Sequence, residues 1–134
     1  MNMSKKEYNR YVTRLAQKSP LGKDLLRSFL VGGLICVIGQ LILNGFTALD
    51  LSEQDAAAAT SVSLVFLSAV LTGLSVYDDI AKFAGAGTLV PITGFANAVV
   101  SAAIEFKAEG RVLGTGAKMF TIAGPVIVYG TLAA

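Results

Sequence analysis

Three long uncharged stretches dominate the pattern of hydrophobic and polar positions along the chain. They cover residues 28–49, 56–77 and 83–104, and each contains 22 residues without Asp, Glu, Lys or Arg. A helix of that length reaches about 33 Å, which is enough to cross the hydrocarbon core of a bilayer. A fourth apolar run, residues 119–134, has 16 residues and would barely cross. The pattern predicts an all-α, polytopic transmembrane helical protein with three to four spans.

The third stretch differs from the first two because it is rich in helix breakers. Gly85, Gly87, Pro91 and Gly94 all fall within ten residues. Each glycine costs a continuous helix about 1 kcal/mol relative to alanine, and proline costs about 3 kcal/mol. We therefore predict that the helix is broken here. Interrupted backbone at membrane depth needs shielding by protein or by a water-filled cavity, so this segment is a candidate for lining a pore or a substrate path.

Charge sets the expected orientation of the chain. Residues 1–27 contain seven of the eleven Lys and Arg residues and two acids, which leaves a local excess of five positive charges. The loop at residues 50–55 has three acids and no base. By the positive-inside rule, the N-terminus is expected in the cytoplasm.

Two topologies remain open for the broken stretch. A hairpin that carries Lys107, Arg111 and Lys118 follows it, and these bases favour the cytoplasmic face. The stretch would then be re-entrant, entering and leaving by the same face. A weak similarity between residues 27–39 and 118–130 agrees, because both segments would leave the cytoplasm in the same direction. The alternative is a third full span followed by an external hairpin.

Residues 1–27 are predicted to form a basic cytoplasmic leader ahead of a transmembrane domain of residues 28–134. Tyr8, Tyr11 and Val12 are interleaved with polar and basic positions, which is typical of an amphipathic helix on a membrane surface. The segment has no small-residue cleavage site after a short apolar core, so it is not a signal peptide. A nucleic-acid-binding arm is the alternative interpretation of the basic charge, and the interleaved apolar positions weigh against it.

Composition excludes several kinds of chemistry. Of the 134 residues, 54% are hydrophobic and 15% are charged, more apolar surface than a soluble domain of this size could bury. With no His and a single cysteine, Cys36, the chain lacks the residues for a disulfide framework, a Cys/His zinc site or histidine acid/base catalysis. The Gly-rich run has no Walker lysine and no preceding strand, so nucleotide binding is unsupported. We expect neither an enzyme nor a cofactor or resident metal.

Polar or small residues recur every three or four positions in the first two stretches, and so share one face of each predicted helix. The first stripe consists of Gly33, Cys36, Gln40, Asn44 and Thr47, and the second of Ser61, Ser68, Thr72, Ser75 and Asp79. Such a stripe either packs against a neighbouring helix or lines a water-filled pathway. A hydroxyl can bond to its own helix backbone, which favours packing for the second stripe. The amides of Gln40 and Asn44 need a protein partner or water.

The adjacent acids Asp78 and Asp79, with Lys82 nearby, mark the expected return of the chain to the cytoplasm. Paired carboxylates can hold a hard cation such as calcium, so the three residues are candidates for cation contact or gating. The alternative is a solvated cap at the membrane edge. The candidates for lining a pore or substrate path are Gln40, Asn44, Ser68, Thr72, Gly85, Gly87, Pro91, Gly94 and Asn97.

Three segments carry a resemblance to a known family. They are FLVGGLICVIGQ at residues 29–40, FAGAGTLVPITGFAN at residues 83–97 and EGRVLGTG at residues 109–116. From about Arg27 to its end, the chain resembles the stage V sporulation protein AC family, part of the SpoVA group of membrane proteins. The paralogous AE family shares these signatures, and the 27-residue leader favours AC. Members of the family are expected to continue past the position of Ala134.

The resemblance implies a function that composition and periodicity do not reveal. SpoVA membrane proteins move dipicolinic acid, with calcium, into the forespore and release it at germination, which implies the spore inner membrane as the location. The AC type is expected to be a tension-gated channel in a hetero- or homo-oligomer, beside a soluble-faced AD-type protein and an AE-type membrane paralogue. No nucleic acid is expected as a partner. The alternative is a non-conducting scaffold that anchors the other SpoVA proteins.

Overall fold

The computed structural model describes residues 4–15 and 20–134, and the described residues form helices without any strand. Three helical runs are long and apolar enough to cross a membrane. They are Leu21–Thr47, Glu53–Gly73 and Arg111–Ala133. The prediction of an all-α, polytopic transmembrane protein is confirmed.

The leading helix α1 (Lys5–Leu15) begins with a reciprocal cap between Ser4 and Glu7. The Ser4 N–H donates to Glu7 Oε2 at 3.0 Å, and the Glu7 N–H donates to Ser4 Oγ at 3.4 Å. The backbone donor favours the charged carboxylate, so the pKa of Glu7 lies below its ordinary value. The predicted leader ends at residue 27, and its last seven residues form the first turns of the next helix, α2 (Leu21–Thr47). The division into leader and membrane domain stays a prediction.

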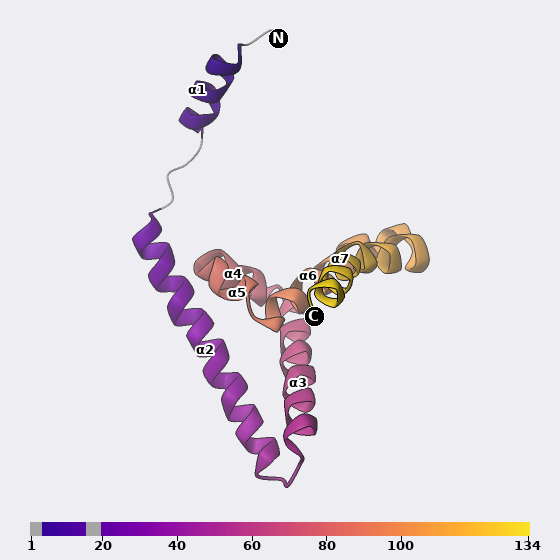
Figure 1. Ribbon diagram of the computed structural model, residues 1–134. Coiled ribbons are helices and arrows are strands. Elements are labelled where there is room, and N and C mark those ends of the chain that lie inside the picture. Colours follow the sequence, from indigo (N-terminus) through magenta and orange to yellow (C-terminus); the bar gives the residue numbers. More distant parts are fainter. Residues whose placement is uncertain (1–3, 16–19) are drawn as a thin grey trace.

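Helices α2 and α3 (Glu53–Gly73) meet at the acidic loop and diverge toward their other ends (Figure 1). Asp50 adopts a left-handed φ of 59° in this loop. Ser52 then caps α3, because its hydroxyl accepts from the Asp55 N–H at 3.2 Å. The turn therefore reverses the chain within a few residues and brings two membrane-length helices together at one end.

The broken segment consists of α4 (Val76–Ala84), α5 (Ala86–Leu89) and α6 (Ile92–Glu105). Helices α4 and α5 lie between the diverging ends of α2 and α3, and α6 packs against α3 (Figure 1). Gly85 has a φ of 53° and a ψ of −121° between α4 and α5, a conformation that favours glycine. Pro91 then takes an extended conformation and precedes α6. The predicted break in the helix is confirmed. Helix α6 has 14 residues and so reaches about 21 Å, short of a full hydrocarbon core.

An earlier break was not predicted. The second span was expected to continue to Tyr77, but α3 ends at Gly73 and Ser75 takes a φ of 59°. The N–H groups of Leu74 and Ser75 bond to the carbonyl oxygens of Val70 and Thr72, which closes the end of the helix. The expectation for the end of this span is therefore wrong, and Tyr77 lies in α4, turned into the protein.

The C-terminal part is also longer than its apolar run suggested. After the 3₁₀ helix η1 (Phe106–Glu109), the π-helix η2 (Arg111–Gly116) continues directly into α7 (Ala117–Ala133). The continuous helical run is 23 residues long, against the 16 residues of the apolar tail. Helices α6 and α7 pack against each other and extend to one side of α3 (Figure 1).

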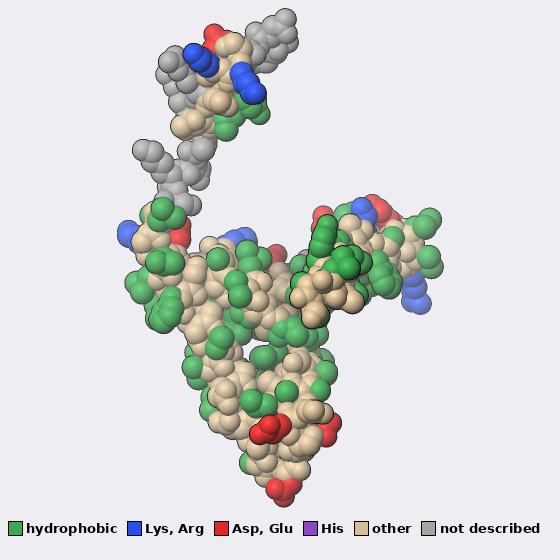
Figure 2. Space-filling view, in the orientation of Figure 1, with side chains coloured by type: hydrophobic (Ala, Val, Ile, Leu, Met, Phe, Trp, Pro, Cys, Tyr) green, Lys and Arg blue, Asp and Glu red, His purple; other side chains and the backbone are tan. Residues whose placement is uncertain are grey.

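Burial in this chain is inverted relative to a soluble protein. No residue of α2 is buried, whereas large apolar side chains such as Phe29, Leu41 and Phe66 are more than half exposed. The buried positions are small or carry hydroxyls, as in helix packing within membranes. They are Ala56, Thr60, Ser68, Thr72, Tyr77, Ala84, Gly87, Thr88, Thr93, Gly94, Ala96, Ala102 and Gly114. Figure 2 shows acidic side chains at the tip where α2 and α3 meet and the visible basic ones toward the opposite end.

Candidate functional site

A cluster of buried hydroxyls joins the broken segment to α3. The Ser68 hydroxyl donates to the Thr93 carbonyl oxygen at 2.6 Å. The Tyr77 hydroxyl lies 3.1 Å from the Thr88 carbonyl oxygen and 3.0 Å from Thr93 Oγ1, so it can donate to the first and accept from the second. All four residues are buried. Because Thr88 and Thr93 lie on either side of Pro91, these bonds hold both flanks of the break. The bond from Tyr77 also satisfies the Thr88 carbonyl oxygen, which lies in the last turn of α5.

The same cluster extends along α3 to α6. Thr72 Oγ1 lies 2.7 Å from the Ser68 carbonyl oxygen and 2.8 Å from Asn97 Oδ1, between which it can share its proton. The structure therefore brings together three of the predicted path residues, Ser68, Thr72 and Asn97. Within the described residues, no buried side-chain polar atom lacks a hydrogen-bond partner. We call the set Ser68, Thr72, Tyr77, Thr88, Thr93 and Asn97 the hydroxyl cluster.

Sequence reasoning missed Tyr77, Thr88 and Thr93. A signal for two of them was present, because Thr88 and Thr93 bracket Pro91, and hydroxyl side chains beside a break can bond to freed backbone groups. Tyr77 gave no such signal. It stood at the end of an apolar run, where tyrosine is also typical of the membrane interface.

Gly87 and Gly94 lie where backbone meets backbone. A Cβ on Gly87 would lie against the Ser28 carbonyl oxygen and 2.8 Å from Ser28 Cα, and a Cβ on Gly94 would lie 2.9 Å from Leu89 Cα. Across the same contact, a Cβ on Gly32 would lie 3.2 Å from the Gly87 carbonyl oxygen. Neighbouring backbone therefore occupies the space beside Gly87 and Gly94, two of the predicted path residues. Small residues allow this close approach in membranes.

Two further contacts tie α2 to the end of α4. The Ser28 hydroxyl donates to the Ala84 carbonyl oxygen at 2.8 Å. The Arg27 guanidinium lies 4.8 Å from the centre of the Phe83 ring, within the range of a cation–π interaction. Both contacts involve residues directly before Gly85, so they fix the break at Gly85 to α2. The hydroxyl cluster fixes the break at Pro91 to α3.

The amides of Gln40 and Asn44 lie apart from the hydroxyl cluster, exposed on α2. Gln40 Nε2 donates to Asn44 Oδ1 at 2.9 Å, one turn along the same helix. Within the described residues, Gln40 Oε1 and Asn44 Nδ2 have no hydrogen-bond partner, so the pair presents a free acceptor oxygen and a free amide nitrogen with two N–H donors to its surroundings. The predicted path residues thus differ in burial. Ser68, Thr72, Gly87 and Gly94 are buried, Pro91 and Asn97 are half-buried, and Gln40, Asn44 and Gly85 are exposed.

Asp78, Asp79 and Lys82 are exposed on α4. Lys82 Nζ lies 3.1 Å from Asp79 Oδ1, and both side chains are more than three-quarters exposed, so the pair contributes little to stability. Among residues 4–15 and 20–134, no three acidic, Cys or His side chains are grouped closely enough to hold a metal ion. Their role in cation contact or gating stays a prediction.

Comparison with known proteins decides the family. The profile of the SpoVAC/SpoVAEB sporulation membrane protein family matches residues 24–134. The chain belongs to this family. Stage V sporulation protein AC of Bacillus subtilis (strain 168) is 47% identical over 135 residues, covering 100% of this chain and 90% of that relative. No solved structure matches. The family resemblance carried by the three sequence motifs is confirmed.

Proposed function

We propose that this SpoVAC-family chain is one subunit of an oligomeric, tension-gated channel that moves dipicolinic acid, with calcium, across the spore inner membrane. One observation carries the proposal. A backbone broken at Gly85 and Pro91 lies against two membrane-length helices, held to α2 by the Ser28–Ala84 hydrogen bond and to α3 by the hydroxyl cluster. Such backbone occurs in membranes where it lies beside protein or a water-filled path. The name of the Bacillus subtilis relative supports the role in sporulation, and the transported substrate rests on the family resemblance.

The path is proposed to lie between subunits. Inside the chain, the buried polar atoms of the hydroxyl cluster all have hydrogen-bond partners, and neighbouring backbone fills the space beside Gly87 and Gly94. On the outside of α2, Gln40 and Asn44 keep an acceptor oxygen and an amide nitrogen free. An amide N–H can bind a carboxylate of dipicolinate, and an amide oxygen suits calcium. We therefore place this amide pair on the path, at contacts with further copies or with AD-type and AE-type partners.

Replacing Gln40 with leucine is expected to slow dipicolinate release from proteoliposomes that contain the purified chain. Loss of one hydrogen-bonding group of about 1 kcal/mol corresponds to roughly a fivefold slower rate. The matched control is Thr47→Val on the same helix, because the Thr47 hydroxyl bonds to its own Leu43 carbonyl oxygen at 2.9 Å and is not free.

Wild-type flux and wild-type complex size in Gln40→Leu would remove the amide pair from the path. If the wild-type chain alone releases no dipicolinate yet still recruits an AD-type partner to the vesicles, the chain is a scaffold and another subunit conducts.

The orientation is proposed to be cytoplasmic at the N-terminus, with the broken segment re-entrant. The loop with Asp50, Glu53 and Asp55 lies at the far end of α2 from Lys23 and Arg27. That distribution supports a cytoplasmic end for the bases. The short length of α6 supports re-entry over a third full span.

Single cysteines in a Cys36→Ser background test this topology. In intact cells that carry the chain in their plasma membrane, a cysteine at Lys5 or Lys107 is expected to resist an impermeant maleimide, while a cysteine at Glu53 is expected to react. Each position is exposed, so reactivity reports the side of the membrane. The neighbouring Gly110 is avoided because its φ of 100° would strain a cysteine. Reaction at Lys107→Cys from outside would contradict re-entry and establish a third full span.

A further inference from the structure

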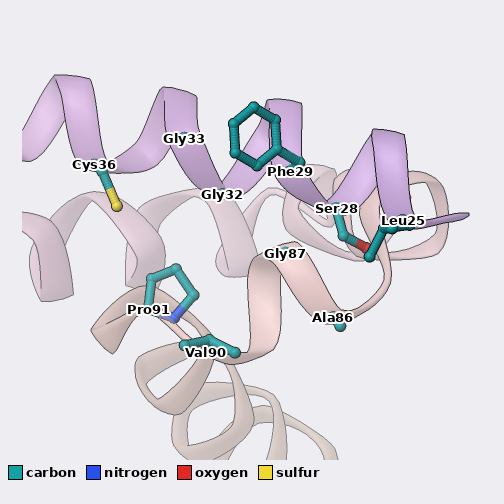
Figure 3. A pocket seen from close by; sticks show the side chains of 10 residues that line it. All are labelled: Leu25, Ser28, Phe29, Gly32, Gly33, Cys36, Ala86, Gly87, Val90 and Pro91. Carbon is teal, nitrogen blue, oxygen red and sulfur yellow. The ribbon is translucent and has the colours of Figure 1, made fainter.

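Two adjoining cavities lie between α2 and the broken segment. The first has a volume of about 430 Å³ and an accessible lining that is entirely apolar. Figure 3 shows α2 on one side of it and α5 with the start of α6 on the other. The lining includes Phe29, Gly33, Cys36, Ala86, Val90 and Pro91. We call this cavity the α2–α5 groove.

The second cavity makes a polar mouth for the groove. It has a volume of about 440 Å³ and shares Leu25, Ser28 and Ala86 with the first. It adds Asp24 and Lys82, which bring one negative and one positive charge. Because Asp24 lies in the first turn of α2, this mouth is at the charged end of the helix, while the groove runs toward its middle.

We propose that the α2–α5 groove and its mouth bind one phosphatidylethanolamine molecule, with an acyl chain in the groove. The phosphate lies beside the Lys82 ammonium and the lipid amine beside the Asp24 carboxylate. Lys82 already faces Asp79 at 3.1 Å, and its ammonium has three donors, so donors remain for a phosphate. This proposal rests on the membrane location of the family and not on the proposed transport function.

The lining favours an acyl chain over other occupants of the groove. The groove is open and offers no polar surface, so a dicarboxylate would lose its hydration there without gaining a hydrogen bond. A helix about 10 Å across occupies roughly 420 Å³ per turn, so the groove has room for only about one turn of a second protein. A flexible acyl chain fills a narrow apolar space and restores the dispersion contacts that a void would lack.

Native mass spectrometry of the purified full chain, with added phosphatidylethanolamine, tests the groove. Gly33→Leu is expected to lower lipid retention about fivefold, the equivalent of about 1 kcal/mol of lost apolar contact. A Cβ on Gly33 meets nothing within 4 Å, so the leucine enters the groove without disturbing the fold. Gly45→Leu is the matched control, since Gly45 lies on the same helix, is equally free of neighbours and lies outside the groove. Equal retention in both variants would overturn the proposal.

The mouth is tested separately with Lys82→Met and Asp24→Asn. Both are expected to weaken retention of phosphatidylethanolamine and to leave diacylglycerol, which lacks the head group, unchanged. Stronger retention of phosphatidylglycerol than of phosphatidylethanolamine would overturn the head-group assignment, because the former has no amine for Asp24. Efficient oxidation of Cys36 to a disulfide between two chains in vesicles would place a second copy in the groove and overturn the lipid proposal.

Discussion

Replacing Gly87 with valine is expected to separate α5 from α2 and to abolish dipicolinate flux. A Cβ at this position would lie 2.8 Å from Ser28 Cα and 2.9 Å from the Ser28 carbonyl carbon. These atoms belong to the backbone of a long helix and cannot turn aside as a flexible side chain could. Overpacking of this kind costs typically 1–3 kcal/mol, and a branched side chain adds two methyl groups to the clash, so we expect a loss of about 3 kcal/mol. Thermal unfolding of the purified protein measures the loss, and proteoliposome release measures the flux.

Gly45→Val is the control for the Gly87 variant. Gly45 lies within α2 with nothing within 4 Å of an added Cβ, so the same change of residue there causes no clash and slightly raises helix propensity, because valine is a better helix former than glycine. It is expected to unfold near the wild-type temperature and to conduct. Normal stability and normal flux in Gly87→Val would show that α5 does not rest on α2 as described. Normal stability with lost flux would instead place Gly87 on the transport path, as first predicted from the sequence.

Replacing Tyr77 with phenylalanine is expected to destabilise the protein by about 1–3 kcal/mol. The substitution removes the Tyr77 hydroxyl, and two buried polar groups lose a hydrogen-bond partner. The Thr88 carbonyl oxygen and the Thr93 hydroxyl both lose their bond to the Tyr77 hydroxyl, and both residues are buried. The aromatic ring stays, so the effect isolates the hydroxyl. The measurement is the unfolding temperature in detergent, together with hydrogen exchange of the amides of α5 and α6.

Tyr129→Phe serves as the matched control for Tyr77→Phe. Tyr129 lies on α7 with 72% of its surface exposed, so its hydroxyl is not held in a buried cluster. This variant is expected to unfold and exchange like the wild type. If Tyr77→Phe behaves the same way, the hydroxyl cluster does not hold the break, and the segment depends on glycine packing against α2 alone.

The groove and the amide pair divide α2 between two environments. Gly33 and Cys36 line the α2–α5 groove, while Gln40 and Asn44 lie further along the helix, outside it. In the sequence these residues form a single stripe. In the structure α5 lies beside the first part of that stripe, and the two amides are exposed beyond it.

The sequence by itself determined the features that depend on local composition. Uncharged stretches of 22 residues predicted membrane helices because the bilayer core has a defined thickness. Gly85 and Pro91 predicted the break because glycine tolerates a positive φ and proline has no N–H for a helical hydrogen bond, both of which are local properties. The sequence predicted the ends of the helices less well. The end of α3 at Gly73 and the extension of α7 through a π-helix were missed, because both depend on hydrogen bonds that close the helix ends and leave no mark in the hydropathy pattern.

Only the tertiary structure decided which polar residues meet. Ser68 and Thr93 are 25 residues apart, and Ser28 and Ala84 are 56 apart, so their contacts depend on where separate helices cross. The same crossings placed Gly87 against α2 and left Gln40 and Asn44 exposed. A residue pattern reports which side of a helix is polar, because neighbours three or four positions apart share a face. It does not report which other helix covers that side, since that choice is made by packing between segments far apart in the chain.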